Sequence, residues 1–332
     1  MGLFDFGMGR RGGSYGYGDG SGQRRGGFNM RWLIALAIAG IGLITYFSRT
    51  QINPVTGEKQ RVAMSVDQEK ALGLQAAPQM AKQMGGVLDP RTNPDAKLVA
   101  EVGHRLVNQT EATKSPYVGN FNFYLLEDPK TINAFALPGG QIFITRGLFN
   151  KLEDESQLAG VLGHEVGHVI HRHSAEHMAK GQLGQMLVTS VAVGASEDSR
   201  KGAMAGMAAA MANQMVQLKY GRADETESDT YGLKLMEQAG YDPRGMLAVM
   251  QVLKEAGGGG RQPEFMMSHP LPENRLTEIK EVIAKRYPDG VPPTLTRGRE
   301  LRGDPQLAGQ RDNRQIEVER RDTRRAPADE RW

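Results

Sequence analysis

The chain has 332 residues, of which 39% are apolar, and a formal net charge of +3. This length and apolar content suffice for one core of about 220 residues, with appendages at its ends. The chain contains no cysteine, which excludes disulfide bonds and cysteine-ligated zinc. Its arginines are accompanied by no stacking aromatic residues and no nucleic-acid-binding motif, so a nucleic-acid partner is not expected.

The first 47 residues form two segments of different composition. Residues 1–29 contain 11 glycines and no apolar periodicity, so we expect a disordered tail. Residues 32–47 are 16 positions without a charge, slightly fewer than the roughly 20 that a membrane-spanning helix needs. Because Met30 adds apolar surface, we predict a transmembrane signal anchor at 30–47. A buried core helix is the alternative, but the glycine-rich tail offers it nothing to pack against.

The charges that flank the segment 30–47 predict its orientation. The positive-inside rule leaves the N-terminus in the cytoplasm and exports the remainder to the periplasm or its equivalent. No small-x-small cleavage site follows, so we expect a retained, single-pass anchor in the inner (cytoplasmic) membrane. More positive charges precede the segment than follow it closely. The arginines that precede its apolar run are Arg10, Arg11, Arg24, Arg25 and Arg31.

A folded domain is predicted at 63–288, after a short linker at 48–62. Apolar residues recur with helical spacing at 63–85 and 95–109, which predicts two helices that pack ahead of a sheet.

Two later segments, at 121–125 and 141–144, show the alternation of apolar side chains that is typical of β-strands. A turn at 138–140, Pro-Gly-Gly, leads into the second of them. We therefore expect an α+β fold that is mainly helical, with a small sheet beside the helices. Three aromatic side chains are expected to lie in its core: Phe121, Phe123 and Phe143.

The sequence His164-Glu165-Val166-Gly167-His168 places two histidines four residues apart with a glutamate between them. On a helix these histidines share a face, so both imidazoles aim at one point. A zinc ion held there would polarise a carbonyl and acidify a bound water, and Glu165 would take the proton of that water. The motif predicts metal-assisted hydrolysis of peptide bonds.

The residues around this motif support a helix. Ser156 is the candidate N-cap, and the acidic residues at 153–155 favour the positive end of the helix. His164 and His168 project away from the apolar face, as a metal site requires; two solvated histidines on an ordinary amphipathic helix are the alternative. The apolar face consists of Leu158, Leu162, Val166, Val169 and Ile170.

A catalytic zinc needs a third protein ligand and one position for water. His171 shares a face with His164 but lies about 10 Å further along the helix, too far to bind the same ion. A metzincin would have glycine at position 171 and histidine at position 174, and Ser174 excludes this class. His173 and His177 fall on the apolar side, where we expect packing or a structural hydrogen bond.

Residues 221–229 indicate a second helix that supplies the missing ligand. Glu225 and Asp229 are four residues apart, so Glu225 is the expected third ligand and Asp229 accepts the outer N–H of a ligand histidine. Glu227 points about 200° away and is expected to be solvated. Gly232 would let the two helices approach closely. An acidic, solvent-facing surface is the alternative for this segment.

Residues 183–215 are rich in alanine, methionine and glycine, and methionines recur with helical spacing in the second half. Core packing between helices explains this stripe best. Contact with the bilayer or with an unfolded client protein is the weaker alternative.

The C-terminal segment 289–332 is predicted to be a disordered, charged tail. From Thr296 onward it holds ten arginines and eight acidic residues, with Trp332 as its aromatic residue. Such a polyampholyte cannot bury enough apolar surface to fold alone. Binding to anionic lipid or to a partner is a possible role.

The motifs occur in an order that resembles the HtpX/BepA/LoiP-like membrane-associated gluzincin metallopeptidases, the group that also contains the CAAX prenyl proteases. The resemblance extends from about Val66 to Arg275 and rests on four blocks. They are the strand-and-turn segment 133–148, the helix at 154–174, Glu225-x-x-x-Asp229 with Ser228 in place of the usual alanine, and Ser268-His269-Pro270 followed by Arg275.

This resemblance implies one zinc ion per chain, with His164, His168 and Glu225 as ligands and Glu165 as the general base. It also implies that an extended substrate adds to the edge strand of the sheet. The residues of that strand are Asn133, Ala134, Phe135 and Ala136.

For His269 the resemblance implies two roles, which stay open. A fourth zinc ligand would shut the site by displacing the water, whereas a nearby imidazolium would stabilise the developing oxyanion. Ser268 and Pro270 place His269 in a loop, so movement between the two roles is possible. Our hypothesis is a self-inhibitory latch.

The resemblance implies a zinc endopeptidase of envelope protein quality control, acting on unfolded, misfolded or misassembled envelope proteins. A non-proteolytic periplasmic chaperone or assembly factor with a latched zinc site is the alternative. Glu165 favours the enzyme, because a structural zinc would gain nothing from it. A membrane scaffold that acts through the disordered ends is a further alternative. The sequence does not indicate an oligomeric state.

Overall fold

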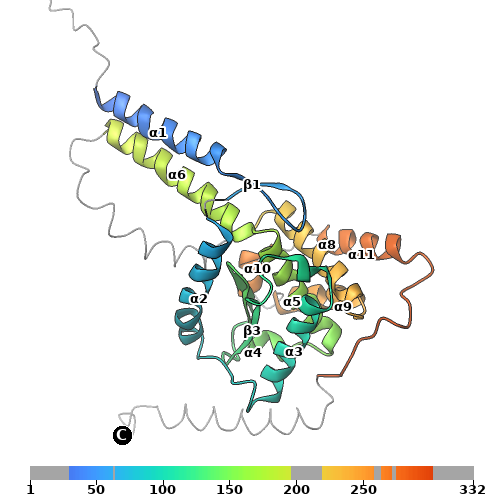
Figure 1. Ribbon diagram of the computed structural model, residues 1–332. Helices are drawn as coiled ribbons and strands as arrows, with labels where there is room; N and C mark the ends of the chain where they lie inside the picture. The colour runs from blue at the N-terminus through green and yellow to red at the C-terminus, as the bar shows by residue number, and fades with distance from the viewer. Residues whose placement is uncertain (1–29, 63, 196–218, 258–262, 271–273, 302–332) are drawn as a thin grey trace, which may run out of the picture.

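The computed structural model describes residues 30–62, 64–195, 219–257, 263–270 and 274–301. Within these ranges the chain is mainly helical with two small sheets, so the α+β class is confirmed (Figure 1). The predicted tail at 1–29, the later part of the predicted tail at 289–332 and the methionine stripe lie outside the described residues.

The described helices run from the N-terminal α1 to α11. They are α1 (Met30–Ser48), α2 (Val66–Gln83), α3 (Pro94–Asn108), α4 (Arg146–Phe149), α5 (Glu155–Ile170), α6 (His173–Ala195), α8 (Arg222–Gln238), α9 (Arg244–Gly257), α10 (Glu264–Ser268) and α11 (Arg275–Arg286), with the 3-10 turn η1 (Glu111–Lys114). The strands are β1 (Thr50–Ile52), β2 (Lys59–Arg61), β3 (Asn122–Leu126), β4 (Ala134–Leu137) and β5 (Gln141–Thr145).

The larger sheet has the strand order β3-β5-β4, with β3 parallel and β4 antiparallel to β5. Strand β4 therefore lies at an edge, and it begins one residue after Asn133. The turn between β4 and β5 uses two left-handed glycines, Gly139 (φ 80°) and Gly140 (φ 104°), a conformation that favours glycine. The aromatic residues expected in the core are buried there: Phe121, Phe123 and Phe143.

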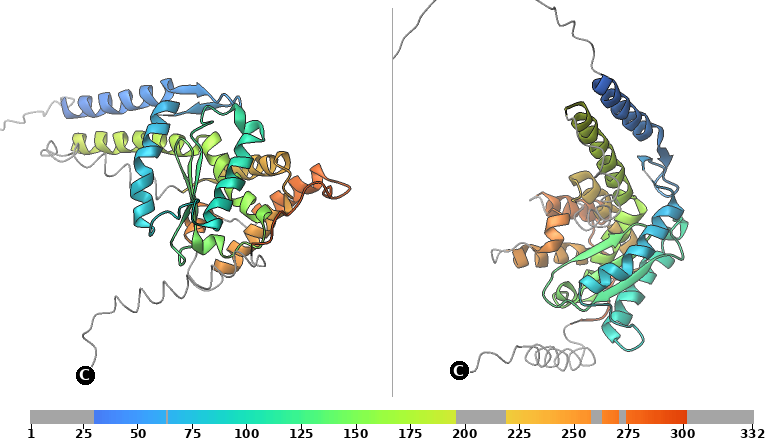
Figure 2. Two further views of the ribbon diagram at one scale, coloured as in Figure 1. Left: turned by 60° about the horizontal axis from the view of Figure 1, so that its bottom comes forward. Right: turned by 90° about the vertical axis from the view of Figure 1, so that its left-hand side faces the viewer.

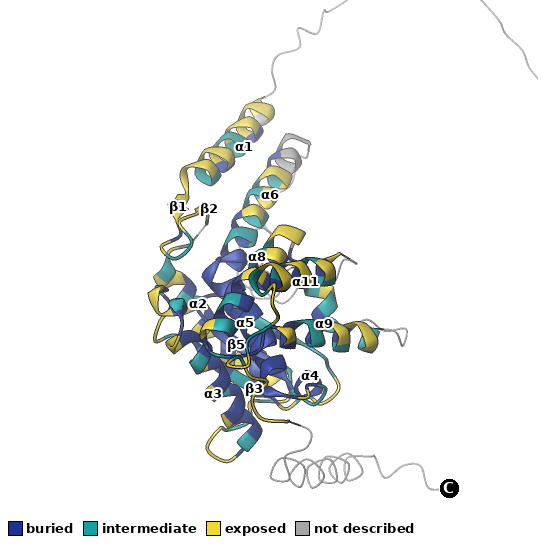
Figure 3. Ribbon diagram, turned by 90° about the vertical axis from the view of Figure 1, so that its right-hand side faces the viewer, coloured by how far each residue is buried: buried dark blue, intermediate teal, exposed yellow. Residues whose placement is uncertain are grey.

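Helix α5 runs through the middle of the domain, and all of its residues are buried (Figure 3). The polar side on which its histidines were expected does not face solvent, because α3, α8, α9 and β4 pack around the helix. Small residues let α8 approach closely. A Cβ atom on Gly163 would lie 3.3 Å from the carbonyl oxygen of Gly232, and one on Gly167 would lie 2.9 Å from the Cα of Ser228. Larger side chains there would force the helices apart.

The N-cap of α5 is Asp154, so the prediction of Ser156 is wrong. Asp154 has an extended backbone (φ −147°, ψ 170°), and its carboxylate accepts a hydrogen bond from the backbone N–H of Gln157 at 3.0 Å. Ser156 lies within the first turn and donates its hydroxyl to the same carboxylate at 2.6 Å. A charged acceptor suits the positive end of the helix better than a hydroxyl does.

Residues 48–62 were expected to form a linker but contain the β1–β2 hairpin, which covers the C-terminal end of α5. The side-chain amide of Asn53 donates to the carbonyl of Ile170 at 2.7 Å, and that of Gln60 donates to the carbonyl of His171. The linker prediction is therefore wrong. The last carbonyls of a buried helix need donors, and the hairpin provides them.

Residues 289–301 were expected to belong to the disordered tail, but the end of this segment, 297–301, lies along the N-terminal end of α5. Backbone N–H groups in the first turn of α5 donate to the carbonyls of Arg297 at 2.9 Å and Arg299 at 3.0 Å. The side chain of Leu301 is buried in the core. The predicted boundary thus lies too early in the chain, because the first N–H groups of α5 need acceptors that this segment supplies.

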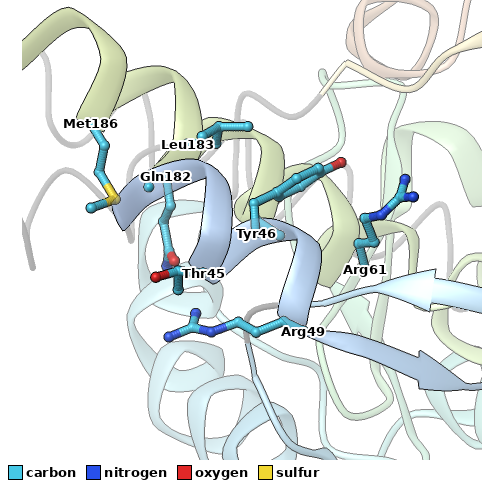
Figure 4. Close-up of a pocket in the computed structure, with 9 residues that line it drawn as sticks. Thr45, Tyr46, Arg49, Arg61, Gln182, Leu183 and Met186 are labelled. Atoms are coloured by element: carbon cyan, nitrogen blue, oxygen red, sulfur yellow. The ribbon is translucent and has the colours of Figure 1, made fainter. Parts of the chain in front are cut away.

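Helix α1 lies alongside α6, and the pair extends away from the rest of the domain (Figures 1 and 2). The expectation that the apolar segment has nothing to pack against is therefore wrong. A cavity of about 30 Å³ lies between the two helices, lined among others by Tyr46, Arg61 and Met186 (Figure 4). Many large apolar side chains of the pair stay exposed: Trp32, Ile34, Leu36, Ile41, Ile44, Phe47, Leu187 and Val188.

In the described part of the chain, no helix has both the length and the apolar character that crossing a membrane requires.

Candidate metal centre

Three side chains from two helices converge at the centre of the domain. His164 and His168 project from successive turns of α5, and Glu225 faces them from the first turn of α8. Nε2 of His164 lies 3.0 Å from Nε2 of His168 and 3.6 Å from Oε2 of Glu225. Nε2 of His168 lies 3.5 Å from Oε1 of Glu225. All three side chains are buried.

These separations fit a zinc ion. Donor atoms bound at about 2.0–2.1 Å lie about 3.4 Å apart around a tetrahedral ion, and the measured separations span 3.0 to 3.6 Å. Two imidazoles and a carboxylate are also the donor set of many catalytic zinc sites. Beside them, Oε1 of Glu165 is buried and makes no hydrogen bond to any described residue. The cluster therefore combines three side chains that could bind a metal with a buried glutamate oxygen that makes no hydrogen bond to a described residue.

His269 adds a fourth donor to this cluster. It is the C-cap residue of α10, and its ring is buried. Its Nδ1 lies 2.9 Å from Oε1 of Glu225 and 3.3 Å from Nε2 of His164. Its Nε2 lies 3.6 Å from Oε1 of Glu165, and the ring stacks on Phe265 with 4.4 Å between centroids. Of the two roles that the sequence leaves open, this position is closer to that of a fourth ligand.

Asp229 lies behind His164. Its Oδ1 is 2.9 Å from Nδ1 of His164, and Arg275 of α11 bonds to both oxygens of the carboxylate, at 2.6 and 2.8 Å. Burial by itself would raise the pKa of Asp229, but the charge and hydrogen bonds of Arg275 outweigh burial and hold that pKa below its usual value. The ionised carboxylate keeps the imidazole proton on Nδ1, which leaves Nε2 free to bind a metal.

His173 supports the other imidazole of α5. Its Nδ1 lies 2.9 Å from Nδ1 of His168, and its Nε2 lies 3.0 Å from Oε2 of Glu227. The structural hydrogen bond predicted for His173 is thus made to a candidate ligand. Glu227 was expected to be solvated but reaches this pair, and the neighbouring His171 and His173 hold its pKa below the usual range.

The two buried glutamates of the cluster have opposite pKa shifts. Burial is the largest influence on Glu165 and raises its pKa. Burial acts in the same direction on Glu225, but His269 and His168 outweigh it and hold the pKa of Glu225 well below its usual value. Burial also lowers the pKa of His168, which keeps this imidazole neutral. An ionised ligand carboxylate beside one that readily takes a proton suits a metal-dependent hydrolase.

The predicted substrate strand lies close to this helix. Strand β4 contains residues 134–136 and packs on α5, and among the described residues it pairs with a strand on one side only. The side chain of Phe135 is partly exposed. The backbone N–H of Phe265 donates to the carbonyl of Ile132 at 3.2 Å, so the helix that precedes His269 is attached next to this edge.

Two further residues at the cluster have no role that the sequence alone assigns. Arg275 is recognisable in the sequence only as part of the fourth block, yet its charge balances two buried carboxylates. The ring of Tyr220 stacks on that of His168, with 4.0 Å between centroids and 28° between planes. Nothing in the sequence marks Tyr220, because it comes directly before the second helix and outside every motif.

A buried helix with two histidines and a glutamate, facing a carboxylate from a later helix, defines a metallopeptidase domain. Residues 94–283 match peptidase family M48, and the chain belongs to this family. The resemblance stated from the motifs is thereby confirmed.

The chain is similar to the beta-barrel assembly-enhancing proteases of Yersinia pestis and Escherichia coli (strain K12). Both are 30% identical, over 239 and 232 residues, and each comparison covers 68% of this chain and 46% of the relative. The mitochondrial metalloendopeptidase OMA1 of Schizosaccharomyces pombe is 29% identical over 252 residues, which cover 76% of this chain and 71% of that protein. The chain thus spans about half the length of the bacterial relatives.

Asp229→Asn is expected to weaken zinc binding by about 10- to 100-fold, the usual effect of altering a group that orients a metal-bound histidine. The substitution removes the negative charge that pairs with Arg275 and that holds the proton of His164 on Nδ1. Competition with a chelator measures the zinc affinity. Glu237→Gln is the control, since Glu237 lies on the same helix but pairs with Arg286. Equal affinities of the two variants would contradict a supporting role for Asp229.

Proposed function

We propose that the chain is a zinc-dependent endopeptidase that hydrolyses peptide bonds in misfolded or misassembled proteins of the cell envelope. The observation that carries this proposal is the buried cluster of His164, His168 and Glu225 with a carboxylate oxygen of Glu165 beside it that makes no hydrogen bond to any described residue. A zinc ion that only stabilised the fold would need no such group.

Each residue has a separate task in the proposed reaction. Zinc held by His164, His168 and Glu225 would polarise the scissile carbonyl and lower the pKa of a water molecule. Glu165, whose pKa is raised by burial, accepts a proton from the attacking water and returns it to the leaving amine. The edge of β4 that pairs with no strand in the described part of the chain holds the substrate backbone in an extended conformation through main-chain hydrogen bonds.

The proposed substrates are envelope proteins that expose an extended segment. The bacterial relatives are named beta-barrel assembly-enhancing proteases, which supports a substrate in the cell envelope. An edge strand binds main-chain groups, and folded proteins keep theirs paired. Selection for unfolded or misassembled chains would follow from this mode of binding.

The proposed location is the inner membrane, with the catalytic domain on the periplasmic side. Exposed apolar side chains on α1 and α6 support contact with lipid. We expect the chain to fractionate with membranes, to resist extraction by alkaline carbonate, and to be digested by protease in spheroplasts. A chain lacking 1–47 should be released. Recovery of the intact chain in the cytoplasmic fraction would contradict this location.

Glu165→Gln should reduce cleavage of an unfolded protein by 10²-fold or more, since general-base groups typically contribute about 10²- to 10⁴-fold. The variant should keep its zinc, because Glu165 is not among the three proposed ligands. Cleavage and zinc content are measured on the full chain, and a chelator should abolish the activity of the unaltered chain. If both chains bind zinc and neither cleaves, while both prevent aggregation of an unfolded protein, the chaperone alternative is supported instead.

His269→Ala tests the proposed latch. Removing the fourth donor opens a position for water, so cleavage should become faster while zinc is held less tightly. Rates with an unfolded substrate and zinc affinity are compared with those of His177→Ala, a control that removes a histidine bonded to Asp224. Slower cleavage by His269→Ala would favour the oxyanion role, and no change in either quantity would rule out both roles.

A further inference from the structure

A second group of metal-ligating side chains lies beyond the C-terminal end of α5. His171 is the C-cap residue of this helix, His173 begins α6, and Glu227 comes from the second turn of α8. One ligand atom from each lies within 4.8 Å of the others. We propose that these three residues bind a second zinc ion, which makes the chain sensitive to the zinc concentration around it.

The distances within this group suit a zinc ion. Nε2 of His173 lies 3.0 Å from Oε2 of Glu227, and Nδ1 of His171 lies 3.4 Å from the same oxygen. Donor atoms around a tetrahedral zinc lie about 3.4 Å apart. Oε2 of Glu58, on the hairpin between β1 and β2, lies 3.6 Å from Nδ1 of His171 on the more exposed side. Two imidazoles and a carboxylate are ligands that zinc accepts readily.

The burial of His171 adds to this argument, because Nδ1 of the ring has only the contacts with Glu227 and Glu58 among the interactions described above. The residue is only 6% exposed, and neither of its ring nitrogens makes a hydrogen bond to any described residue. Buried polar groups are nearly always paired, because leaving one unpaired costs free energy. A cation bound to Nδ1 would give that nitrogen a partner, and Glu227 supplies the negative charge that such a cation needs.

The backbone between the two histidines holds the group in place. Arg172 adopts a left-handed conformation (φ 59°), which is uncommon for a residue with a side chain. It ends α5 and brings the rings of His171 and His173 together, with 5.4 Å between centroids and 26° between planes. The side chain of Arg172 is fixed by Glu69 at 3.0 Å and Gln51 at 2.7 Å. The two imidazoles are therefore positioned before any ion binds.

The second site is coupled to the first through His173, a step that rests on zinc binding at the proposed catalytic site. Zinc on Nε2 of His173 requires the imidazole proton on Nδ1, and zinc on Nε2 of His168 requires the same of His168. Two N–H groups would then face each other across the 2.9 Å contact. The alternative acceptor for His173 is Oγ of Ser228, 3.4 Å away. Filling the second site therefore weakens zinc at the first, and the effect is reciprocal.

The experiment is a zinc titration of the full, metal-free chain in competition with a fluorescent chelator. We expect two zinc ions per chain, with the second bound more weakly because Glu227 is partly exposed to solvent. His171→Ala should bind one. Glu227→Gln should also lose the second ion. This variant alters a partly exposed residue and keeps the contact with His173, so it tests the site even if His171→Ala does not fold. His177→Ala is the control, because His177 lies on α6 like His173 but bonds to Asp224. This variant should still bind two zinc ions.

The coupling is measured in the same titration. In the unaltered chain, saturation of the second site should weaken the first by about tenfold, the scale of effects from groups that support a metal ligand. Cleavage should fall over the same range of zinc concentration, and His171→Ala should lose this inhibition. If the zinc affinity of the first site does not change when the second site is filled, the proposed coupling is wrong.

Two outcomes would overturn the second site itself. One is a single zinc ion per unaltered chain, and the other is two ions in His171→Ala. Since the number of bound ions is measured without a substrate, a chain that binds two zinc ions but does not cleave would refute the peptidase proposal and leave the second site standing.

Discussion

The close packing of α5 against α8 is the constraint on which the candidate metal centre depends. A Cβ atom on Gly232 would lie 3.0 Å from the backbone nitrogen of His164 and 2.9 Å from the side chain of Met246, so only glycine fits there without a shift of the helices. Backbones this close bring the short carboxylate of Glu225 within reach of both imidazoles of α5. They also place Asp229, one turn further along α8, level with the outer nitrogen of His164.

This packing buries more negative charge than a core tolerates without compensation. Carboxylates removed from water are costly unless they are paired and hydrogen-bonded. Arg275 of α11 meets this need for two of them, because its Nη1 lies 2.5 Å from Oε2 of Glu225 and its Nε lies 2.6 Å from Oδ2 of Asp229. Oε1 of Glu165 lies 3.6 Å from Nε2 of His269, and burial outweighs this neighbour and raises the pKa of Glu165. The same arginine therefore offsets the burial of both carboxylates, His269 and His168 hold the pKa of Glu225 low, and Glu165 stays available for proton transfer.

Features that depend on residues close together in the sequence could be predicted, and features that depend on distant residues could not. Helical spacing alone predicts that His164 and His168 lie on one face of a helix and aim at one point. The same spacing predicts that Glu225 and Asp229 share a face of α8. Gly232 indicates that the two helices meet. By contrast, the contact of His173 with His168 depends on the left-handed backbone conformation of Arg172. No sequence pattern predicts that conformation. The pairing of α1 with α6 and the β1–β2 hairpin depend on partners more than a hundred residues away, and local periodicity carries no information about these.

The complete burial of α5 explains why segments from both ends of the chain pack against it. A helix leaves four N–H and four C=O groups unpaired at its ends, and a buried helix cannot pair them with water. Asn53 and Gln60 donate to carbonyls at one end, and the carbonyls of Arg297 and Arg299 accept at the other. The guanidinium of Arg299 also pairs with Glu155 in the first turn. Sliding α5 along its axis would break bonds at both ends and move its imidazoles away from α8, so these distant segments fix the geometry of the metal centre from outside it.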